Sequence, residues 1–210
     1  MWLALARLQT AAWNEWRVEP PQAGKRRGME ILMAMRNGDH RLTKRMAAWD
    51  SAWARRVLPP VEDAAEHTKL WWAAAVAMAA GGGWRGRKAA AAGITAMAVG
   101  ELLSNGVAKQ LVERPRPPKE WIPHDDVEER PDSSSFPSGH TCAAVAFTAG
   151  VALSWPWAGA ACAVPMTLVA LERVHSGAHY PSDVAAGAVI GLAAAALVRK
   201  APSMFLRYTG

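Results

Sequence analysis

The chain has few of the residues that cross-link a fold. It holds only two cysteines, Cys142 and Cys162, and each lies in an apolar segment. Because they give neither a disulfide framework nor a metal-ligand pattern, we expect two small buried residues that say little about the compartment. The sequence also lacks a sheet pattern, a nucleotide-binding glycine loop and an internal repeat, which excludes the common nucleotide-binding and repeat architectures.

The first 40 residues lack the long apolar region and the small-residue cleavage site of a signal peptide. Polar residues interrupt the apolar ones in Met1–Trp16, so we expect a surface or interfacial helix there at most. The length of 210 residues favours one main domain. The expected division is an N-terminal extension (1–40), a helical-bundle domain (41–202) and a C-terminal tail (203–210).

The chain is basic, with a formal net charge of +6 and a pI of about 9.7. A nucleic-acid binder is the usual interpretation of such a pI. Here, however, basic residues flank apolar stretches, as at residues 84–88 and at Arg199-Lys200. That placement suits a membrane surface better than a nucleic acid, so we expect a bilayer and no nucleic acid as partner.

Apolar residues recur at helical spacing between Leu42 and Val57, Trp49 and Trp53 among them, with charged residues opposite. The pattern predicts an amphipathic helix suited to the membrane interface. The alternative is an ordinary helix packed on a soluble core. Pro59-Pro60 is expected to end this helix.

Five apolar segments follow, near residues 70–84, 89–112, 140–155, 157–171 and 184–198. Several are shorter than the roughly 20 residues of a spanning helix, so core helices of a soluble bundle are the alternative. Tryptophans at segment ends, small residues in the interiors and few internal charges favour spanning helices. Glu101 and Asn105 are expected to face the bundle interior. The predicted fold is all-α: a membrane-embedded helical bundle of about five spanning helices plus an N-terminal amphipathic helix.

Basic and histidine residues gather in three separated clusters that border the apolar segments. The clusters run from Lys109 to Pro117, from Pro137 to His140 and from Arg173 to Asp183. Together they supply a lysine, two arginines, two histidines and a carboxylate, which are the groups that a metal-free phosphoryl-transfer site needs. Fixed cations can hold the non-bridging oxygens, one imidazole can attack phosphorus, and a second can protonate the departing oxygen.

These clusters resemble the signature of the type-2 phosphatidic acid phosphatase superfamily. The signature is Lys, six residues, Arg-Pro; then Pro-Ser-Gly-His; then Ser-Arg, five residues, His, three residues, Asp. All three parts occur here in order and with that spacing, over residues 109–183. One position departs: Glu172 precedes Arg173 where the family usually has Ser. The change bears on a hydroxyl contact near the phosphate and on the charge state of the preferred substrate.

The resemblance implies an integral-membrane lipid-phosphate phosphatase that works through a phosphohistidine intermediate, without a metal or organic cofactor. His179 would attack phosphorus while Asp183 holds its other ring nitrogen. His140 would protonate the leaving oxygen and then activate water. The phosphoryl oxygens would be bound by Lys109, Arg116, Arg173, Ser138 and the Gly139 amide.

Alternating helix directions would bring residues 113–139 and 172–183 to the same side, so that the three clusters meet at one face. Ser138 can cap a helix that begins beside it, and the helix N-terminus is a natural anion site. Arg114 also belongs to the first cluster, but the family spacing selects Arg116. We therefore expect Arg114 to be a solvated or headgroup-facing charge.

Three residues of the third cluster allow a competing interpretation. His175, His179 and Asp183 are spaced four apart, which could present three metal ligands on one helix face. Gly177 and Pro181 interrupt that helix, and nearby cations would repel a metal. We expect His175 to be a hydrogen-bonding residue instead. A separate histidine, His124, is expected to be a loop or lid residue without a catalytic part.

Three other functions are open at this stage: a vanadium haloperoxidase, a soluble periplasmic acid phosphatase of the same superfamily, and a non-catalytic lipid-binding or scaffold protein.

The candidate substrates are polyprenyl diphosphates, phosphatidic acid, phosphatidylglycerol phosphate and a polyprenyl-phosphoribose phosphate. The resemblance implies a multi-pass protein of the cell membrane with an extracytoplasmic site. Arg85, Arg87, Lys88, Arg199 and Lys200 would then lie on the cytoplasmic side. An odd number of spans would put the basic N-terminal region beside the site, in conflict with that rule. The oligomeric state is open.

Overall fold

The computed structural model describes residues 23–123 and 133–208. The interfacial helix expected in Met1–Trp16 lies outside these ranges. The chain forms two compact units, residues 1–38 and 39–210. The extension was expected to end at residue 40. This position lies inside the helix α2 (Ala23–Ala47), whose last nine residues belong to the larger unit.

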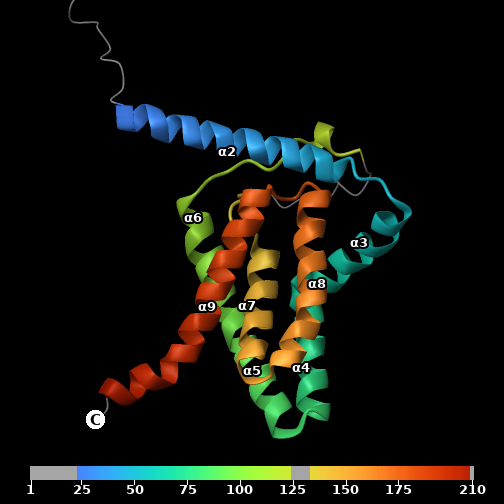
Figure 1. Cartoon of the computed structure of the whole chain (residues 1–210). Coiled ribbons are helices and arrows are strands. Elements are labelled where there is room, and N and C mark those ends of the chain that lie inside the picture. Colours follow the sequence, from blue (N-terminus) through green and yellow to red (C-terminus); the bar gives the residue numbers. More distant parts are fainter. Residues whose placement is uncertain (1–22, 124–132, 209–210) are drawn as a thin grey trace, which may run out of the picture. The chain divides into compact units, whose positions relative to one another are not determined.

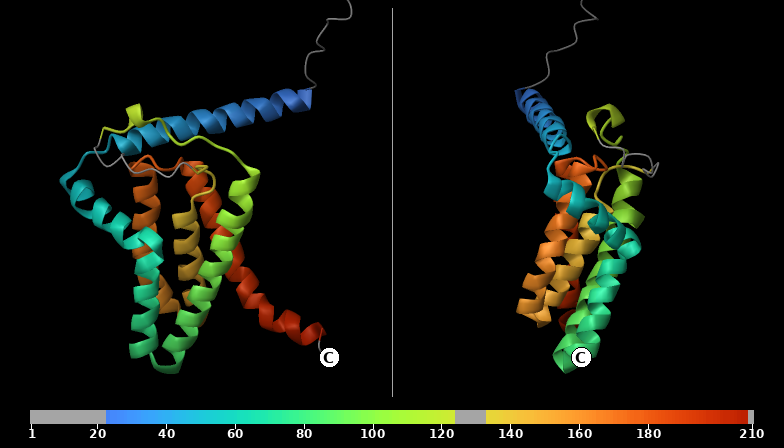
Figure 2. Two further views of the ribbon diagram at one scale, coloured as in Figure 1. Left: turned by 180° about the vertical axis from the view of Figure 1, so that it is seen from behind. Right: turned by 90° about the vertical axis from the view of Figure 1, so that its right-hand side faces the viewer.

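The five predicted apolar segments are confirmed as helices of the larger unit, and no strand occurs in the described ranges (Figure 1). They are α4 (Lys69–Gly81), α5 (Gly83–Glu101), α7 (Gly139–Ser154), α8 (Pro156–His175) and α9 (Pro181–Tyr208). Two views from other sides show α7 between its neighbours (Figure 2). It packs against α5, α8 and α9, and ten of its residues are buried.

Small residues allow the helices around α7 to approach closely, as helix contacts in lipid prefer. A Cβ on Gly150 of α7 would lie 2.6 Å from the Ala92 carbonyl oxygen of α5. Trp71 of α4 and Phe147 of α7, the two largest fully buried side chains among the described residues, lie against each other with ring centroids 5.3 Å apart. Cys142 is buried there as predicted, whereas Cys162 is only partly buried.

Three helices are long and apolar enough to cross a membrane: Gly83–Leu111, Pro156–His175 and Pro181–Lys200. The apolar helices α7 and α4 are shorter, with 16 and 13 residues. Large apolar side chains point outward from the bundle, which suits lipid rather than water; examples are Val76, Trp84, Trp157, Val164 and Val189. Trp71 does lie at a segment end, in the first turn of α4, but it is not part of an aromatic belt, because its side chain is 1% exposed and fills the core.

The amphipathic helix predicted between Leu42 and Val57 is two helices. Helix α2 ends at Ala47, and α3 (Ala52–Ala65) begins after Ser51, whose side chain accepts a hydrogen bond from the Ala54 N–H at 3.0 Å. This N-cap restarts the helix in a new direction. The prediction that Pro59-Pro60 ends the helix is also wrong. Both prolines lie inside α3. Because proline has no N–H, the carbonyl groups four residues earlier, on Arg55 and Arg56, lose their helical hydrogen bonds. Both residues are exposed, so water can take the place of the missing donors.

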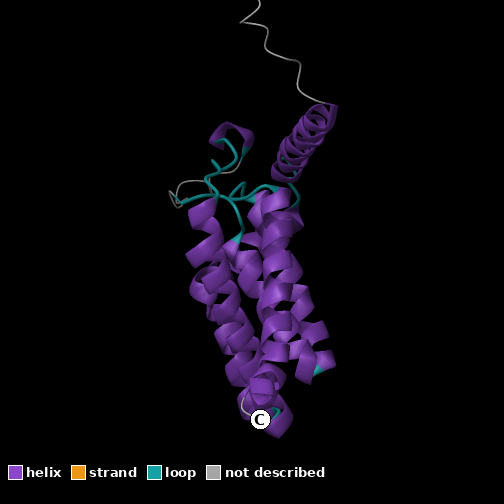
Figure 3. Cartoon of the chain, turned by 90° about the vertical axis from the view of Figure 1, so that its left-hand side faces the viewer, coloured by secondary structure: helices purple, strands orange, loops and turns teal. Residues whose placement is uncertain are grey.

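The longer loops between the helices gather at one end of the bundle, while the short turns between α4 and α5 and between α7 and α8 lie at the other (Figure 3). The two predicted loops meet there, because the Ser135 carbonyl lies 2.6 Å from the His179 ring and the Ser138 N–H donates to the Asp183 carbonyl. The prediction that the three clusters meet at one face is therefore confirmed.

Candidate functional site

A cavity of about 230 Å³ opens at the loop end of the bundle. Its wall contains six of the eight residues that the sequence assigns to the site: Lys109, Arg116, Gly139, His140, Arg173 and His179. The other two, Ser138 and Asp183, are fully buried behind this wall. Three cations and two imidazoles therefore surround one space large enough for a phosphate group.

A π-helix brings the first cluster to the cavity. Helix α5 continues as the π-helix Leu102–Ala108 and then as the short helix α6 (Lys109–Leu111). A π-helical turn holds more residues than an α-helical one, so it changes which side chains face the site. Lys109 lines the cavity, and so do Glu101 and Asn105, which were expected to face the bundle interior. The helix ends at Leu111, before Pro115, and the chain then turns back to bring Arg116 to the cavity.

The N-terminus of α7 forms a second wall. The Ser138 side chain accepts from the Thr141 N–H at 3.4 Å and lies 3.0 Å from the Thr141 hydroxyl, so it caps the helix as predicted. Gly139 and His140 follow in the first turn, beside unpaired N–H groups. A Cβ on Gly139 would lie 2.9 Å from the Asn105 Oδ1 atom, so glycine permits this close approach.

A glycine turn places Arg173 and His179 together. Gly177 has a φ of +64°, which glycine adopts without strain, and it ends α8 as predicted. The His179 N–H then donates to the Arg173 carbonyl at 2.9 Å. Arg116 fixes the same turn, because its Nη1 donates to the Ala178 carbonyl at 2.8 Å.

The hydrogen bond on the His179 ring sets the tautomer. Its Nδ1 lies 2.6 Å from the Ser135 carbonyl oxygen, which can only accept, so Nδ1 carries the proton and Nε2 is the basic nitrogen. The Asp183 carboxylate was expected at this position. It lies 3.9 Å from Nδ1 and accepts from the Tyr180 N–H at 2.9 Å. Burial, together with the charge of Arg116, holds the pKa of His179 well below its usual value, so the ring is neutral at neutral pH.

The expectation that Arg114 is solvated is wrong. Its guanidinium donates to Asp183 Oδ1 at 2.5 Å, to Asp39 Oδ2 at 2.7 Å and to the Ser182 hydroxyl at 2.7 Å. Its carbon Cζ lies 4.1 Å from the centre of the Tyr180 ring. Burial lowers the pKa of Arg114, but the hydrogen bonds to Asp39 and Asp183 outweigh it and raise the pKa.

Asp39 completes this network from α2. Its Oδ1 accepts from the Ser182 N–H at 3.0 Å and its Oδ2 from the Ser182 hydroxyl at 2.5 Å, so it caps the first turn of α9 from another helix. Sequence reasoning missed Asp39 and Ser135. Neither lies in a motif, and the Ser135 contact is made by a backbone carbonyl that any residue would supply.

The Arg173 guanidinium is paired with two carboxylates. Its Nε donates to Glu172, the residue that departs from the family pattern, and its Nη2 donates to Glu62 Oε1 of α3 at 2.5 Å. Glu172 is therefore an ion-pair partner of the arginine that follows it in the chain. No local pattern pointed to Glu62.

His175 lies apart from the cavity, and its Nε2 is 3.0 Å from the Trp49 carbonyl oxygen. The prediction of a hydrogen-bonding histidine is confirmed. Within residues 23–123 and 133–208, no group of three His, Cys, Asp or Glu side chains is arranged to hold a metal ion. His124 lies outside the residues that the structure describes.

The apolar helices and the cationic cavity at their end define a helical membrane protein with an anion-binding site. The profile of the PAP2 superfamily matches residues 89–207, more than half of the chain. The chain belongs to this superfamily, and the resemblance of its three motifs is confirmed.

Named relatives match shorter stretches. Decaprenylphosphoryl-5-phosphoribose phosphatase of Mycobacterium tuberculosis is 38% identical over 95 residues, which cover 43% of this chain and 49% of that protein. Lipid A 1-phosphatase of Rhizobium etli is 48% identical over 60 residues, 27% of this chain and 25% of that protein. The match thus spans about half the length of the mycobacterial relative and about a quarter of the length of the rhizobial one.

Among solved structures, a PAP2-type phosphatidylglycerolphosphate phosphatase from Bacillus subtilis, described as transmembrane, has a similar fold. The TM-score is 0.61 at 21% identity, with 81% of this chain and 87% of that chain covered. At this level of identity, the similarity shows that the two chains share a fold.

Proposed function

We propose that this chain is an integral-membrane phosphatase that hydrolyses the phosphomonoester or diphosphate of a polyprenyl lipid or glycerolipid through a phosphohistidine. The observation that carries the proposal is a cavity in which Lys109, Arg116 and Arg173 surround two histidines at the end of apolar helices. The names of the mycobacterial and rhizobial relatives support the same class of reaction.

In the proposed first step, His179 Nε2 attacks phosphorus and forms a P–N bond while the ester P–O bond breaks. His140 gives a proton to the departing lipid oxygen. The Ser135 carbonyl on Nδ1 supports this role because it leaves Nε2 unprotonated. Asp183, close to the same nitrogen, would stabilise the positive charge that the ring gains.

In the second step, His140 takes a proton from water, the water oxygen attacks phosphorus, and the P–N bond breaks to release phosphate and neutral His179. Lys109, Arg116, Arg173 and the Gly139 amide would hold the non-bridging oxygens throughout. Ser138 would contribute through the cap that it forms on α7 rather than through its hydroxyl, which contacts Thr141.

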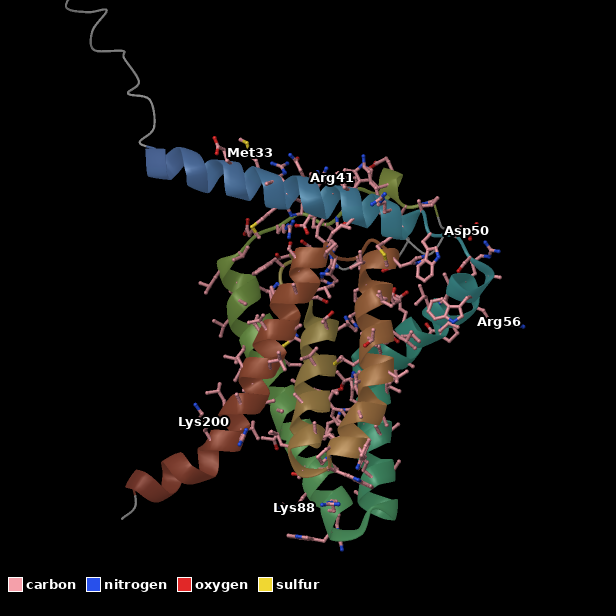
Figure 4. The ribbon with its side chains drawn as sticks, viewed as in Figure 1. Met33, Arg41, Asp50, Arg56, Lys88 and Lys200 are labelled. Atoms are coloured by element: carbon pink, nitrogen blue, oxygen red, sulfur yellow. The ribbon has the colours of Figure 1, made fainter. Side chains whose placement is uncertain are left out.

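The protein would cross the membrane several times, with the cavity on the extracytoplasmic face. Lys88 and Lys200 support this orientation, because Lys88 lies at the end of the bundle away from Asp50 and the loops, and Lys200 lies in the half of the bundle toward that end (Figure 4). Basic residues favour the cytoplasmic side of spanning helices. Among candidate lipids, the name of the mycobacterial relative favours a polyprenyl-phosphoribose phosphate.

Phosphate release from a panel of lipid phosphates by the purified protein in detergent tests the proposal. We expect hydrolysis by the wild type and no phosphoenzyme in His179→Ala. His140→Ala should lose less activity on an aryl phosphate with an acidic phenol than on a lipid phosphate, because that leaving group needs no proton. Equal losses on both substrates would contradict the role of His140, and an inactive wild type would contradict the function.

A further inference from the structure

One edge of the Arg173 guanidinium is covered by two carboxylates from different helices. Nε donates to Glu172 of α8, and Nη2 donates to Glu62 of α3 at 2.5 Å. Nε and Nη2 form the side of a guanidinium that binds a carboxylate or phosphate through two parallel hydrogen bonds. A phosphate that binds Arg173 in this way must therefore displace at least one of the carboxylates.

Glu62 is the partner that can be displaced. Its side chain is 40% exposed, whereas that of Glu172 is 3% exposed and adjacent to Arg173 in the chain. When Glu62 leaves, its carboxylate returns to water and recovers hydration, while a displaced Glu172 would be a buried, unpaired charge. Exposed or partly exposed ion pairs are also weak, which makes the exchange feasible.

Glu62 also lies where an incoming phosphate would meet it. It lines the same cavity as Lys109, Arg116 and Arg173, on the wall formed by α3. It precedes the stretch that matches the superfamily profile, residues 89–207, and belongs to none of the three motifs. Glu62 and Glu101 both line this cavity, and Glu62 is the one whose carboxylate pairs with Arg173.

We infer that Glu62 is an internal competitor for Arg173, one that lowers the affinity of the cavity for phosphate groups, free or esterified. The cost of displacing its carboxylate is the same for both ligands, so it lowers both affinities by a similar factor. In terms of the proposed function, on which only this biological sense rests, contacts to the lipid offset that cost for the substrate. Released phosphate has no such contacts, so the carboxylate favours its departure.

Direct binding of inorganic phosphate to the purified full-length protein in detergent tests this. Glu62→Gln keeps the shape and removes the charge, so Kd for phosphate should fall about two- to fivefold, the range set by a partly exposed ion pair. The matched control is Asp63→Asn, which removes the same charge from an exposed neighbour on α3 and should leave Kd unchanged. Glu62→Ala should act in the same direction as Glu62→Gln.

A gain of affinity is a result that damage to the fold does not produce. Unchanged or weaker phosphate binding in both Glu62 variants would overturn the inference, as would an equal gain in Asp63→Asn. Binding requires no turnover, so this outcome is separate from the proposed function, which fails if the wild type hydrolyses no lipid phosphate. In an active protein, inhibition by phosphate should strengthen in Glu62→Gln, and KM for the lipid should fall by a similar factor.

Discussion

The Asp183 carboxylate is held by two hydrogen bonds beside the ring of His179, the proposed nucleophile. One oxygen accepts from Arg114, while the other accepts from the Tyr180 N–H and faces the His179 ring at 3.9 Å. Arg114 is in turn held by Asp39. At the scale of single residues, the position of Asp183 therefore depends on an arginine that does not line the cavity.

Arg114→Lys tests this dependence. A lysine keeps the charge but cannot donate from one planar group to both Asp39 and Asp183, so Asp183 should shift. Because a displacement of about 1 Å can cost about a hundredfold in rate, we expect kcat to fall about ten- to a hundredfold with little change in KM. The control is Arg56→Lys on the exposed side of α3. A rise in KM at constant kcat would place Arg114 in substrate binding instead.

Glu172→Ser restores the residue usual in the family and removes one carboxylate from Arg173. Affinity for phosphate-bearing substrate should rise and the pH profile should shift, because a nearby negative charge is lost. Breaking a buried pair costs about 3–5 kcal/mol, and Glu62 offsets part of it, so the melting temperature should also fall. Plots of kcat/KM against pH decide the matter: superimposable profiles for the two proteins would contradict a role at the phosphate.

At the scale of elements, the bundle depends on how closely α7 can approach its neighbours. Glycines face backbone atoms across these contacts: a Cβ on Gly187 of α9 would lie 2.4 Å from the Ser138 carbonyl oxygen. Since Ser138 caps α7 directly before His140, the packing of α9 against α7 also positions the cavity wall.

Gly150→Ala measures the contact between α5 and α7. The added methyl group would meet the Ala92 carbonyl oxygen at 2.6 Å, so the helices must separate, at a typical cost of about 1–3 kcal/mol. Thermal unfolding in detergent should show a lower melting temperature. Gly81→Ala is the control, because nothing lies within 4 Å of its Cβ. Equal melting temperatures for both variants would show that the contact tolerates separation.

At the scale of the whole molecule, the proposed chemistry relies on fixed cations. Activity should survive excess EDTA, and vanadate should inhibit as a mimic of phosphate in the cavity. Phosphate release measured with and without chelator provides the check. Activity that is lost in EDTA and restored by a divalent ion would overturn the mechanism.

The sequence predicts the helices and most of the cavity because their signals are local. Apolar length marks the helices, and motif spacing selects residues such as Lys109 and His140. The break between α2 and α3 and the partners of Arg114 were not predictable in this way. The hydrogen bond from the Ala54 N–H to the Ser51 side chain starts a new helix although the helical pattern of apolar residues continues through this point. Arg114 pairs with Asp39, which is 75 positions away in the chain. Such contacts exist only once the helices have packed.

The sixteen residues of α7 have one further consequence. At about 1.5 Å per residue the helix rises only about 24 Å, whereas the hydrocarbon layer of a bilayer is about 30 Å thick. Such a mismatch is relieved by local thinning of the bilayer. Thinning would bring the headgroup layer to the depth of His140, which lies in the first turn of α7. A lipid could then reach the cavity sideways, by diffusing in the plane of the membrane, without its chains being lifted into water.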